Sequence, residues 1–370
     1  MSAVTDAVVI GGGLHGLSAA LHLARRGVRV TLFERDRIGR HASGATAAGV
    51  RILNRDPAEI PLALVSNRLW RDIGALVGDD CGFHAHGMVR VAEHPADLAP
   101  LRERAALVRG LGYDHEEMID AAELFGLVPA LARHCAGALI CRRDGAADPH
   151  RTLAAFRRAA EAAGVVIHEG APVSRIVREE GCWRIEAGAL AVTARSVVNA
   201  AGAWGGRIGA MLGEALPLRP KALMMIVTEK VAPFLGPVMS IYGRKLSFKQ
   251  TDRGTLLLGG GHEGVPDLET GRSEVRAAVV ARGAKAATDL FPAIGPLRVA
   301  RIWAGIEAAT ADALPIIERS PRLPDVVHAV GFTGHGFQLV PVVGGIVADL
   351  VIDGGTALPI APFAAARFAA

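Results

Sequence analysis

The feature that most constrains this chain is a glycine-rich turn that directly follows a short apolar segment near its start. Residues 7–10 are uninterruptedly apolar, as in a central parallel strand that is buried on both faces. Gly11, Gly13 and Gly16 follow with the spacing G-x-G-x-x-G, and residues 17–26 then repeat apolar side chains with helical period. The segment therefore predicts a strand, a tight turn and a helix whose N-terminus can receive an anion such as a pyrophosphate.

A second predicted strand, at 28–33, supports this interpretation. It ends at Glu34, about twenty residues after the glycines, where dinucleotide-binding units place a carboxylate on a ribose. A carboxylate at this position favours an unphosphorylated ribose, and therefore FAD or NAD over NADP. The glycines alone could serve packing, but strand, helix, second strand and acid in register predict a Rossmann-type dinucleotide-binding domain.

The composition is that of a large folded protein. Of the 370 residues, 51% are hydrophobic and 21% are charged, so we expect the chain to fold throughout, with room for more than one domain. The net charge of +4 is spread along the sequence, without the basic blocks of nucleic-acid-binding proteins. We expect no nucleic-acid partner, although a mildly basic chain could dock on an acidic protein.

The sequence shows no signal for export or for a membrane span. The first residues lack the basic region of a secretory signal, and the longest apolar run, 337–351, is short and interrupted by Pro341 and Asp349. We therefore expect no transmembrane segment and a cytoplasmic location. The cysteines are too sparse for a disulfide framework and form no C-x-x-C pair; they are Cys81, Cys135, Cys141 and Cys182.

The residues after Glu34 indicate which dinucleotide is bound. Residues 42–50 are almost all small, so a flat ring could lie along them. With segments further along, this loop resembles the D-amino acid oxidase superfamily of flavoproteins, especially its glycine oxidase, sarcosine oxidase and hydroxyproline or opine dehydrogenase branches. The resemblance covers nearly the whole chain. The matching segments are residues 8–10 with the glycine turn and Glu34, the loop 43–50, Asp148-Pro149, residues 197–204, Trp303-Ala304-Gly305 with Asp312 and Pro315, and Gly334-His335-Gly336.

The resemblance implies a two-domain α/β fold like that of p-hydroxybenzoate hydroxylase. A Rossmann-type FAD-binding domain would comprise 1–51, 137–215 and 300–370, and a substrate-binding domain with a mostly antiparallel sheet would comprise 52–136 and 216–299. The residues that the resemblance places on FAD are Gly11, Gly13, Leu14, His15, Gly16, Glu34, Arg35, Ser43, Gly44, Ala47, Ala48, Gly49, Val173, Ala200, Ala201, Gly202, Trp204, Gly305, Gly334, His335, Gly336, Phe337 and Gln338.

Two of these segments can also be interpreted from their residues alone. Residues 196–199 predict a buried strand that enters a tight turn at 200–202 and a helix at 203–212, an arrangement that also serves ordinary packing. Residues 326–330 predict the last strand, and a glycine loop then opens a helix at about Gln338. By resemblance, the start of this helix faces the N1 and C2 carbonyl edge of the flavin. His335 would donate a hydrogen bond there or only tether the loop.

The sequence argues against a covalent bond to the flavin. Related dimethylglycine-type dehydrogenases use His-Ala-Ala-Gly for that bond, whereas this chain has Thr46-Ala47-Ala48-Gly49. No cysteine follows Cys182, which removes the cysteinyl link of monomeric sarcosine oxidases. We expect non-covalent FAD, with His41 as the one remaining candidate for a link.

The substrate side offers fewer motifs. Residues 217–228, 241–250 and 255–260 predict strands of a mostly antiparallel sheet, and residues 52–136 predict a helical insertion that caps the site. Since flavin dehydrogenation depends mainly on placing a C–H bond and keeping the amine neutral, catalytic residues are hard to identify from sequence. The candidates by position are Arg51, Tyr242, Arg244, Lys249, His262, Glu307 and His335.

Several of these candidates have a plain structural alternative. Arg51 could bind a substrate carboxylate in a bidentate manner, or lie at the surface. Tyr242 resembles a pocket tyrosine of glycine oxidase, but core packing explains it equally well. His84 and His86 lack a third ligand nearby, so we predict no metal site.

Glu307 is the main departure from the pattern of the family. Where glycine oxidase has an arginine that holds the substrate carboxylate, this chain reads Trp303-Ala304-Gly305-Ile306-Glu307. Either Arg51 or Lys249 holds the carboxylate instead, or the substrate offers a cationic group to Glu307; a plain surface glutamate is the third alternative. The oxygen-activating lysine of monomeric sarcosine oxidase would fall near Leu257, which favours a dehydrogenase over an oxidase.

We predict that the chain oxidises a small amine or amino acid, such as hydroxyproline, an opine or sarcosine, by hydride transfer to flavin N5. The product is an imine, and the electrons would pass to partner subunits in a hetero-oligomer. Two alternatives remain: oxidation of a 2-hydroxy acid on the same fold, and a flavin-binding subunit without catalysis. An NAD-linked dehydrogenase is a weaker alternative.

Overall fold

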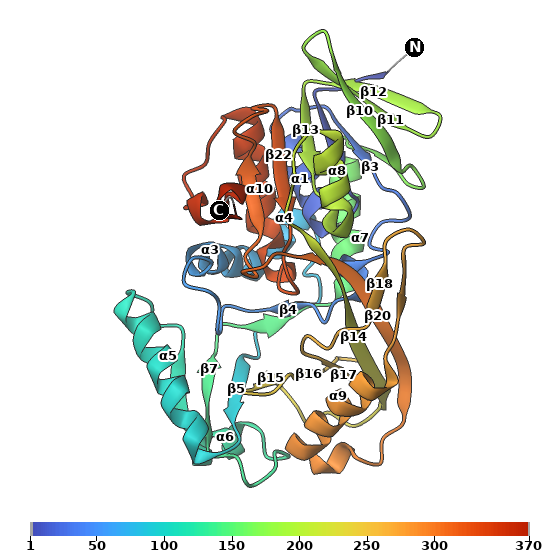
Figure 1. The fold of residues 1–370 in the computed structure, drawn as a ribbon. Coiled ribbons are helices and arrows are strands. Elements are labelled where there is room, and N and C mark those ends of the chain that lie inside the picture. Colours follow the sequence, from blue (N-terminus) through green and yellow to red (C-terminus); the bar gives the residue numbers. More distant parts are fainter. Residues whose placement is uncertain (1–2, 369–370) are drawn as a thin grey trace.

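The computed structural model describes residues 3–368 and has one large sheet in each half of the molecule (Figure 1). The first sheet has six strands in the order β21-β22-β13-β2-β3-β9, and all its pairs are parallel except β21 with β22. Its strands are β2 (Ala7–Ile10), β3 (Val30–Phe33), β9 (Val166–His168), β13 (Ser196–Asn199), β21 (Ile316–Arg319) and β22 (Val326–Val330).

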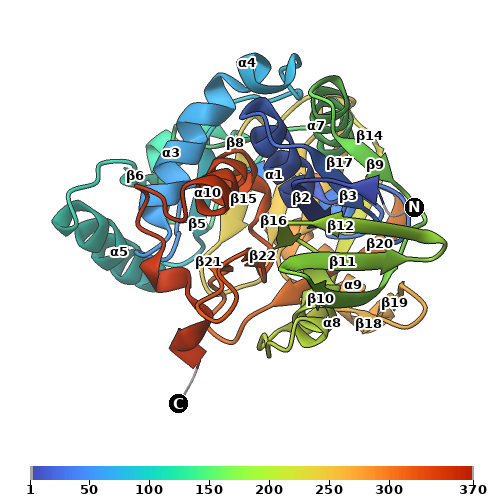
Figure 2. The ribbon, with the colours of Figure 1, turned by 90° about the horizontal axis from the view of Figure 1, so that it is seen from above.

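The unbroken apolar run of β2 reflects burial on both faces of this sheet. Ala7 and Val9 belong to the core shared with the helices on one face, whereas Val8 and Ile10 belong to the core beneath a small four-stranded sheet on the other (Figure 2). The helices are α1 (Leu14–Arg25), α7 (Pro149–Ala162) and α10 (Val340–Ile352); the small sheet contains β1 (Ala3–Val4), β10 (Val173–Glu179), β11 (Cys182–Ala187) and β12 (Leu190–Ala194), and α8 (Gly205–Met211) lies beside it.

The second large sheet has eight strands in the order β20-β14-β17-β16-β15-β5-β7-β6, and only β15 with β5 is parallel. The predicted mostly antiparallel sheet and the two-domain α/β class are therefore confirmed. Helix α9 (Ala277–Leu290) packs on one face of this sheet. The strands are β5 (Met88–Ala92), β6 (Glu117–Asp120), β7 (Gly137–Cys141), β14 (Arg219–Lys230), β15 (Val238–Ile241), β16 (Ser247–Gln250), β17 (Thr255–Gly259) and β20 (Val299–Ala309).

The insertion at 52–136 is not purely helical, so that prediction was incomplete. It does contain helices, but β5 and β6 extend the eight-stranded sheet, and α3 packs against α10 of the other half. Amphipathic periodicity detected the helices but could not say which sheet the short strands join. The helices are α3 (Ile60–Arg71), α4 (Ile73–Val77), α5 (Leu98–Gly110) and α6 (Ala121–Leu127).

Three other boundaries differ from expectation. The single strand predicted at 241–250 is two strands, β15 and β16, joined by a turn that contains Gly243 at φ +74°. The last helix begins with a 3-10 turn at Phe337–Leu339 rather than at Gln338, and its α-helical part starts at Val340 with Pro341 in the first turn, where no backbone donor is needed. Strands β7 and β20 lie in the eight-stranded sheet, although the predicted division assigns 137–215 and 300–370 to the FAD-binding domain.

Five short elements lie outside the large sheets: α2 (Ala42–Ala45), the antiparallel pair of β4 (Gly49–Val50) with β8 (Gly145–Ala146), and the antiparallel pair of β18 (Val265–Asp267) with β19 (Arg272–Glu274). Across residues 3–368, no helix combines the length and apolar character that a membrane span requires.

Candidate functional site

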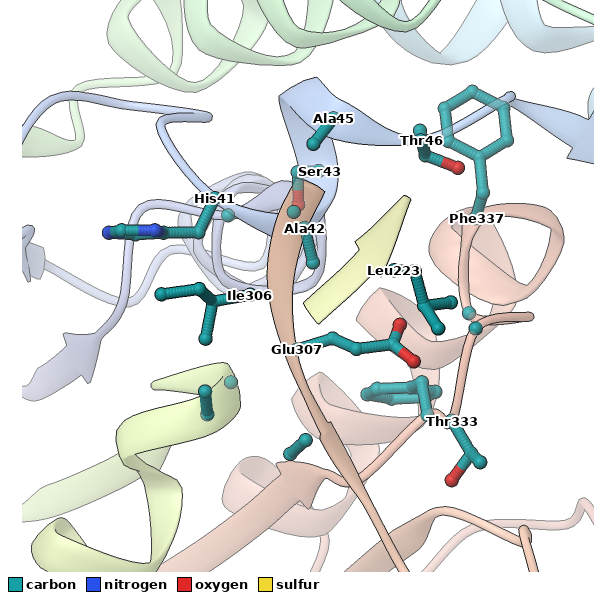
Figure 3. A pocket seen from close by; sticks show the side chains of 18 of the residues that line it. His41, Ala42, Ser43, Ala45, Thr46, Leu223, Ile306, Glu307, Thr333 and Phe337 are labelled. Carbon is teal, nitrogen blue, oxygen red and sulfur yellow. The ribbon is translucent and has the colours of Figure 1, made fainter. Parts of the chain in front are cut away.

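A cavity of about 870 Å³ lies between the two large sheets. Its volume falls at the upper end of the range for small-molecule and cofactor sites. One wall is formed by the glycine turn, the loop with α2, the segment after β13 and the loop after β22; the other wall is one face of the eight-stranded sheet. Figure 3 shows where these walls meet: Ile306 and Glu307 extend to opposite sides of β20, and the loop that contains Ser43 and Thr46 lies beside this strand.

The glycine turn is shaped by close backbone contacts. Gly11 has φ +114°, and a Cβ placed there would lie 2.3 Å from the carbonyl oxygen of Ala200. A Cβ on Gly16 would lie 1.9 Å from the carbonyl oxygen of Gly11, so this glycine allows the helix to pack on the turn. Helix α1 starts at Gly13 without a side-chain cap and has no acidic residue in its first turn. Its N-terminus is therefore suited to an anion in the cavity.

Glu34 lies at the cavity wall but is engaged by the backbone. Its Oε2 accepts a hydrogen bond from the Gly12 N–H at 2.7 Å, and its Oε1 accepts one from the Asp36 N–H at 2.8 Å. Burial is the main cause of a raised pKa for this carboxyl. Each carboxylate oxygen has a second lone pair, so ribose binding by Glu34 stays a prediction.

The segment after Glu34 brings aromatic and basic groups to the same end of the cavity. The Arg35 guanidinium lies 4.1 Å from the centre of the Trp204 ring, a cation–π contact. The His41 ring lies 4.6 Å from the Trp204 ring, and its Nε2 is 3.0 Å from an oxygen of Asp36. His41, the remaining candidate for a covalent link, is thus held by a carboxylate.

The loop of small residues lies directly under β20. A Cβ on Gly305 would lie 2.4 Å from the Cβ of Ala45, and the Trp303 Nε1 donates a hydrogen bond to the Ala45 carbonyl oxygen. Ala48 has φ +55°, a conformation that the Thr46 hydroxyl supports by accepting from its N–H. These contacts hold the loop against β20, and its residues Ala42, Ser43, Ala45, Thr46 and Ala47 line the cavity.

His15 provides an unpaired polar group in the cofactor-facing wall. Among the described residues, neither ring nitrogen has a hydrogen-bond partner, and the ring stacks on Phe332 with 3.6 Å between centroids. Burial lowers the pKa of His15 to about 3, so the imidazole is neutral and can donate one hydrogen bond and accept one. Buried polar groups are normally satisfied, and a ligand with its own donors and acceptors would satisfy this one.

The loop after β22 is held by a buried network around His335. The Nδ1 of His335 accepts a hydrogen bond from Arg55 at 2.6 Å, and its Nε2–H donates to the Ala313 carbonyl oxygen at 3.1 Å. This tautomer is assigned from the partners. Glu59 lies 3.3 Å from Nδ1, and its carboxylate also faces Arg55 at 3.6 Å. His335 lines the cavity, but its nitrogens are already used within the protein.

The opposite wall consists of side chains that alternate along the strands of the eight-stranded sheet. Four strands contribute residues at every second position, as expected for one face of a pleated sheet. They are Met88 and Arg90 on β5, Val238 and Ser240 on β15, Lys221, Leu223 and Met225 on β14, and Gly305 and Glu307 on β20; Met224, Ile241, Ile306 and Ala308 also reach the cavity. On β5 and β15, the intervening residues Val89 and Met239 pack in the core that includes α9, whereas Ile306 packs with Ala203 and Trp204.

Two charged side chains of this wall have atoms without hydrogen-bond partners in the part of the chain that the structure describes. Glu307 is half-buried at the cavity wall, and its buried Oε1 has no hydrogen-bond partner among the described residues. Burial raises the pKa of Glu307 to about 7, and the nearby Lys221 ammonium partly opposes this increase. The Nε of Arg90 also lacks a partner within residues 3–368, and its guanidinium lies 5.5 Å from the ring of Tyr242. Burial lowers the pKa of Arg90.

Arg51 lies beside this wall, at the end of β4. Its Nη1 donates hydrogen bonds to the carbonyl oxygens of Leu53 and Asn54, at 2.6 and 3.1 Å. Burial is the largest cause that lowers the pKa of Arg51 to about 9, followed by the positive charge of Arg55. Because Arg51 lines the cavity and is not at the surface, the surface alternative for this residue is wrong.

Most of the residues expected on FAD line this one cavity. Those that do not are Gly16, Gly44, Ala48 and Gln338. Gly44, like Gly16, permits a close backbone approach, since its Cβ would lie 2.1 Å from the Gly39 carbonyl oxygen. The Gln338 side-chain amide donates to the Ala63 carbonyl oxygen, and the Gln338 backbone carbonyl oxygen accepts from the Ser66 hydroxyl and the Trp70 Nε1–H, so Gln338 fastens α3 to the loop.

The substrate candidates divide in the same way. Arg51, Arg244, Glu307 and His335 line the cavity, whereas Tyr242, Lys249 and His262 do not. The Lys249 Nζ donates to the Ala147 carbonyl oxygen, and burial lowers its pKa to about 8. Arg244 is paired with Glu93 and Asp289. Sequence reasoning missed Arg90 and Lys221, which the two-residue period of β5 and β14 could have assigned to one face.

Three comparisons with known proteins agree with this geometry. A family model described as FAD dependent oxidoreductase matches residues 6–350. The chain is 28% identical to a glycine oxidase of Geobacillus kaustophilus, over 98% of this chain and 97% of that protein, and 27% identical to a sarcosine oxidase subunit beta of Rhizobium meliloti, over 98% and 88%. The structure is similar to that of an L-proline dehydrogenase from P. horikoshii, with a TM-score of 0.92, 27% identity and coverage of 100% and 99%.

Proposed function

Because this chain belongs to the DAO family of FAD-dependent oxidoreductases, we propose that its cavity holds FAD without a covalent bond and oxidises a small amino acid or amine. The observation that carries the proposal is one cavity in which a dinucleotide-type glycine turn faces a sheet that presents unpaired charged groups. Bound FAD would supply the oxidant, accepting at N5 a hydride from the carbon beside the substrate nitrogen. The product would be an imine.

The residues of the first wall fit the parts of FAD. The N-terminus of α1 would receive the pyrophosphate, and Glu34 would accept from a ribose hydroxyl. The ring would lie along the loop that contains Ser43 and Thr46, near the start of α10. Thr46 stands at the position of the linking histidine in related dehydrogenases, and His41 is held by Asp36, which supports non-covalent binding.

The residues of the second wall suit a substrate that carries both signs of charge. Arg51 and Arg90 lie close enough for their charges to interact, and each has donors that no protein group uses fully. Guanidinium groups bind carboxylates in a bidentate manner, so this pair is suited to a carboxylate of the substrate. Four strands separate β5 from β20 in the sheet, so a carboxylate at this pair and a cation at Glu307 would belong to a substrate whose two charged groups are not on the same carbon.

For the electron acceptor, we propose a dehydrogenase that passes electrons to a partner subunit. By the resemblance to monomeric sarcosine oxidase, the oxygen-activating lysine would fall near Leu257, which is buried on β17. The relative named sarcosine oxidase subunit beta is, by its name, one subunit of an assembly. We also keep a cytoplasmic location as a proposal.

The test is direct observation of the flavin. Purified protein should be yellow, and acid precipitation should release FAD into the supernatant. Under anaerobic conditions, at least one of glycine, sarcosine, L-proline, D-proline and hydroxyproline should bleach the absorbance near 450 nm, which is about the usual position of the flavin band. Bleaching by lactate alone would favour the 2-hydroxy acid alternative. Colourless protein that does not take up added FAD would overturn the proposal.

A further inference from the structure

The Glu307 side chain is half-buried, and one of its carboxylate oxygens is buried without a hydrogen-bond partner among residues 3–368. Figure 3 shows it on β20, pointing into the cavity between Leu223 and Thr333. Its Oε1 has no hydrogen-bond partner among residues 3–368, and no lysine, arginine or histidine nitrogen of the described chain lies within the 4.0 Å of an ion pair. A buried carboxylate normally has a cationic partner or hydrogen bonds, so the missing partner is expected to come from a ligand.

The elements packed against Glu307 bring only a few charged groups. Lys221 faces it from the paired position on β14, but the Lys221 ammonium lies 3.6 Å from an oxygen of Glu263, which comes from the segment after β17. The loop after β22 offers its Gly334 backbone, where a Cβ would lie 3.5 Å from Oε1, while both nitrogens of His335 in that loop are engaged elsewhere. Helix α2 has no charged residue. The space in front of Glu307 is therefore free for a small cation.

We propose that Glu307 binds the ammonium group of the substrate and accepts its proton, so that the substrate of this enzyme is a primary or secondary amine bound as a cation. This inference rests on the proposed function. The N–H⁺ bond of the ammonium breaks and its proton moves to a carboxylate oxygen of Glu307. The nitrogen lone pair that is released forms the C=N bond as the electron pair of the neighbouring C–H bond leaves to the flavin, the oxidant.

The position of Glu307 suits this proton transfer. Burial raises its pKa to about 7, so the carboxylate is available at neutral pH and can also hold and release a proton. A positioned base is needed because an amine that stays protonated has no lone pair to form the imine. The same feature selects the substrate: 2-hydroxy acids carry no cation for Glu307, so their binding would leave this carboxylate unpaired.

The test is the pH dependence of anaerobic flavin reduction in the holoenzyme, measured by stopped flow at low substrate between pH 6 and 10. Wild-type rate constants should rise through about pH 7 and then stay level up to the pKa of the substrate amine. In Glu307→Gln, the rate constant at pH 7 should fall by about 10²–10⁴-fold. It should then climb tenfold per pH unit, because only the neutral amine reacts. The FAD content should be unchanged.

Two further variants show whether the rise of the rate constant near pH 7, the lower limb of the pH profile, reflects the ionisation of Glu307. Glu263→Gln removes a like charge that raises the pKa of Glu307, so the limb should move to lower pH. Lys221→Met removes a cation that lowers this pKa, so the limb should move to higher pH.

The outcomes separate the two proposals. If no amine bleaches the wild-type flavin, both proposals fail. If an amine bleaches it, but Glu307→Gln keeps the wild-type pH profile and rate, only the assignment of Glu307 fails. If the Glu307→Gln protein loses FAD, Glu307→Asp is measured in its place. This variant should react more slowly but keep a rate constant that is independent of pH above about pH 7. Loss of that pH-independent region in Glu307→Asp overturns the assignment.

Discussion

The two walls of the cavity are built in different ways. The cofactor-facing wall consists of backbone turns and small residues. Its shape depends on close backbone contacts: a Cβ placed on Gly16 would lie only 1.9 Å from the Gly11 carbonyl oxygen. The sheet wall consists of side chains from β5, β14, β15 and β20, which are distant in sequence. The first wall allows few substitutions, whereas the second can exchange side chains on an unchanged backbone. We infer that the first wall sets the cofactor and the second sets the substrate.

The largest effect should follow from a methyl group in the first wall. In Gly16→Ala, the new Cβ would collide with the Gly11 carbonyl oxygen, so the helix must move away from the turn. We expect the free energy of unfolding to fall by about 3 kcal/mol or more, together with loss of FAD. Thermal unfolding and the FAD content of the purified protein measure both effects.

Gly74→Ala is the matched control for this variant. It lies in helix α4, where a Cβ would meet nothing within 4 Å, so the change should be neutral or slightly stabilising. Gly16→Ala protein that keeps FAD and wild-type stability would contradict the view that the turn is rigid.

An effect of intermediate size should follow from the second wall. Arg90→Met removes a guanidinium that has an unpaired Nε at the cavity, so the Kd of the substrate in anaerobic bleaching should rise by about 10–100-fold. The FAD content and the melting temperature should change little. Arg175→Met, whose side chain is 62% exposed on the small sheet, should leave the Kd unchanged. Loss of FAD from Arg90→Met would contradict the division between the walls.

The same difference explains what the sequence could predict. The glycine turn, Glu34 and the loop of small residues lie within one continuous stretch, so their roles follow from local order and spacing. Most of the residues expected on FAD do line the cavity. The two large sheets were also predictable, because β2 is apolar throughout whereas the substrate-side strands have turn signals between them.

The substrate wall could not be predicted in this way because it depends on strand order. Arg90 joins the wall only because β5 pairs in parallel with β15, a pairing between segments about 150 residues apart that no local pattern specifies. The candidates Tyr242 and Lys249 come from a stretch that is two strands and a turn, and this difference places both side chains outside the cavity. In the first wall, Gln338 lies in a 3-10 turn at the start of the last helix and does not line the cavity, so its contact with FAD stays a prediction.

Replacing His15 should have a smaller effect, which stabilises the apoprotein but weakens the binding of FAD. In His15→Leu, two buried nitrogens without partners are removed, so the apoprotein should be stabilised by about 1 kcal/mol. If FAD normally pairs with one of these nitrogens, the Kd of FAD should rise roughly tenfold. Differential scanning calorimetry of the apoprotein and quenching of FAD fluorescence on binding measure the two changes.

His22→Leu is the matched control for His15→Leu. His22 lies on the same helix, is half-buried with a buried Nε2 that has no partner among the described residues, and lies outside the cavity. Its replacement should leave the Kd of FAD within about twofold. If His15→Leu binds FAD as tightly as the wild type, then the unpaired nitrogens serve no cofactor, and the first wall acts through its backbone alone.

The smallest effect on function is expected for Lys249→Met, because this side chain lies outside both walls. Burial lowers the pKa of Lys249 to about 8, below that of the unfolded chain, so the unfolded state binds more protons between about pH 8 and 10.5. Wild-type stability should therefore rise with pH across that window, while Lys249→Met should lack this rise and be more stable by about 1–3 kcal/mol at pH 7. Denaturant unfolding at pH 7 and at pH 10 measures the difference. Flavin reduction should stay within about twofold of the wild type; a larger loss would mean that Lys249 reaches the substrate, and that the sheet wall extends beyond the face defined by Arg90 and Glu307.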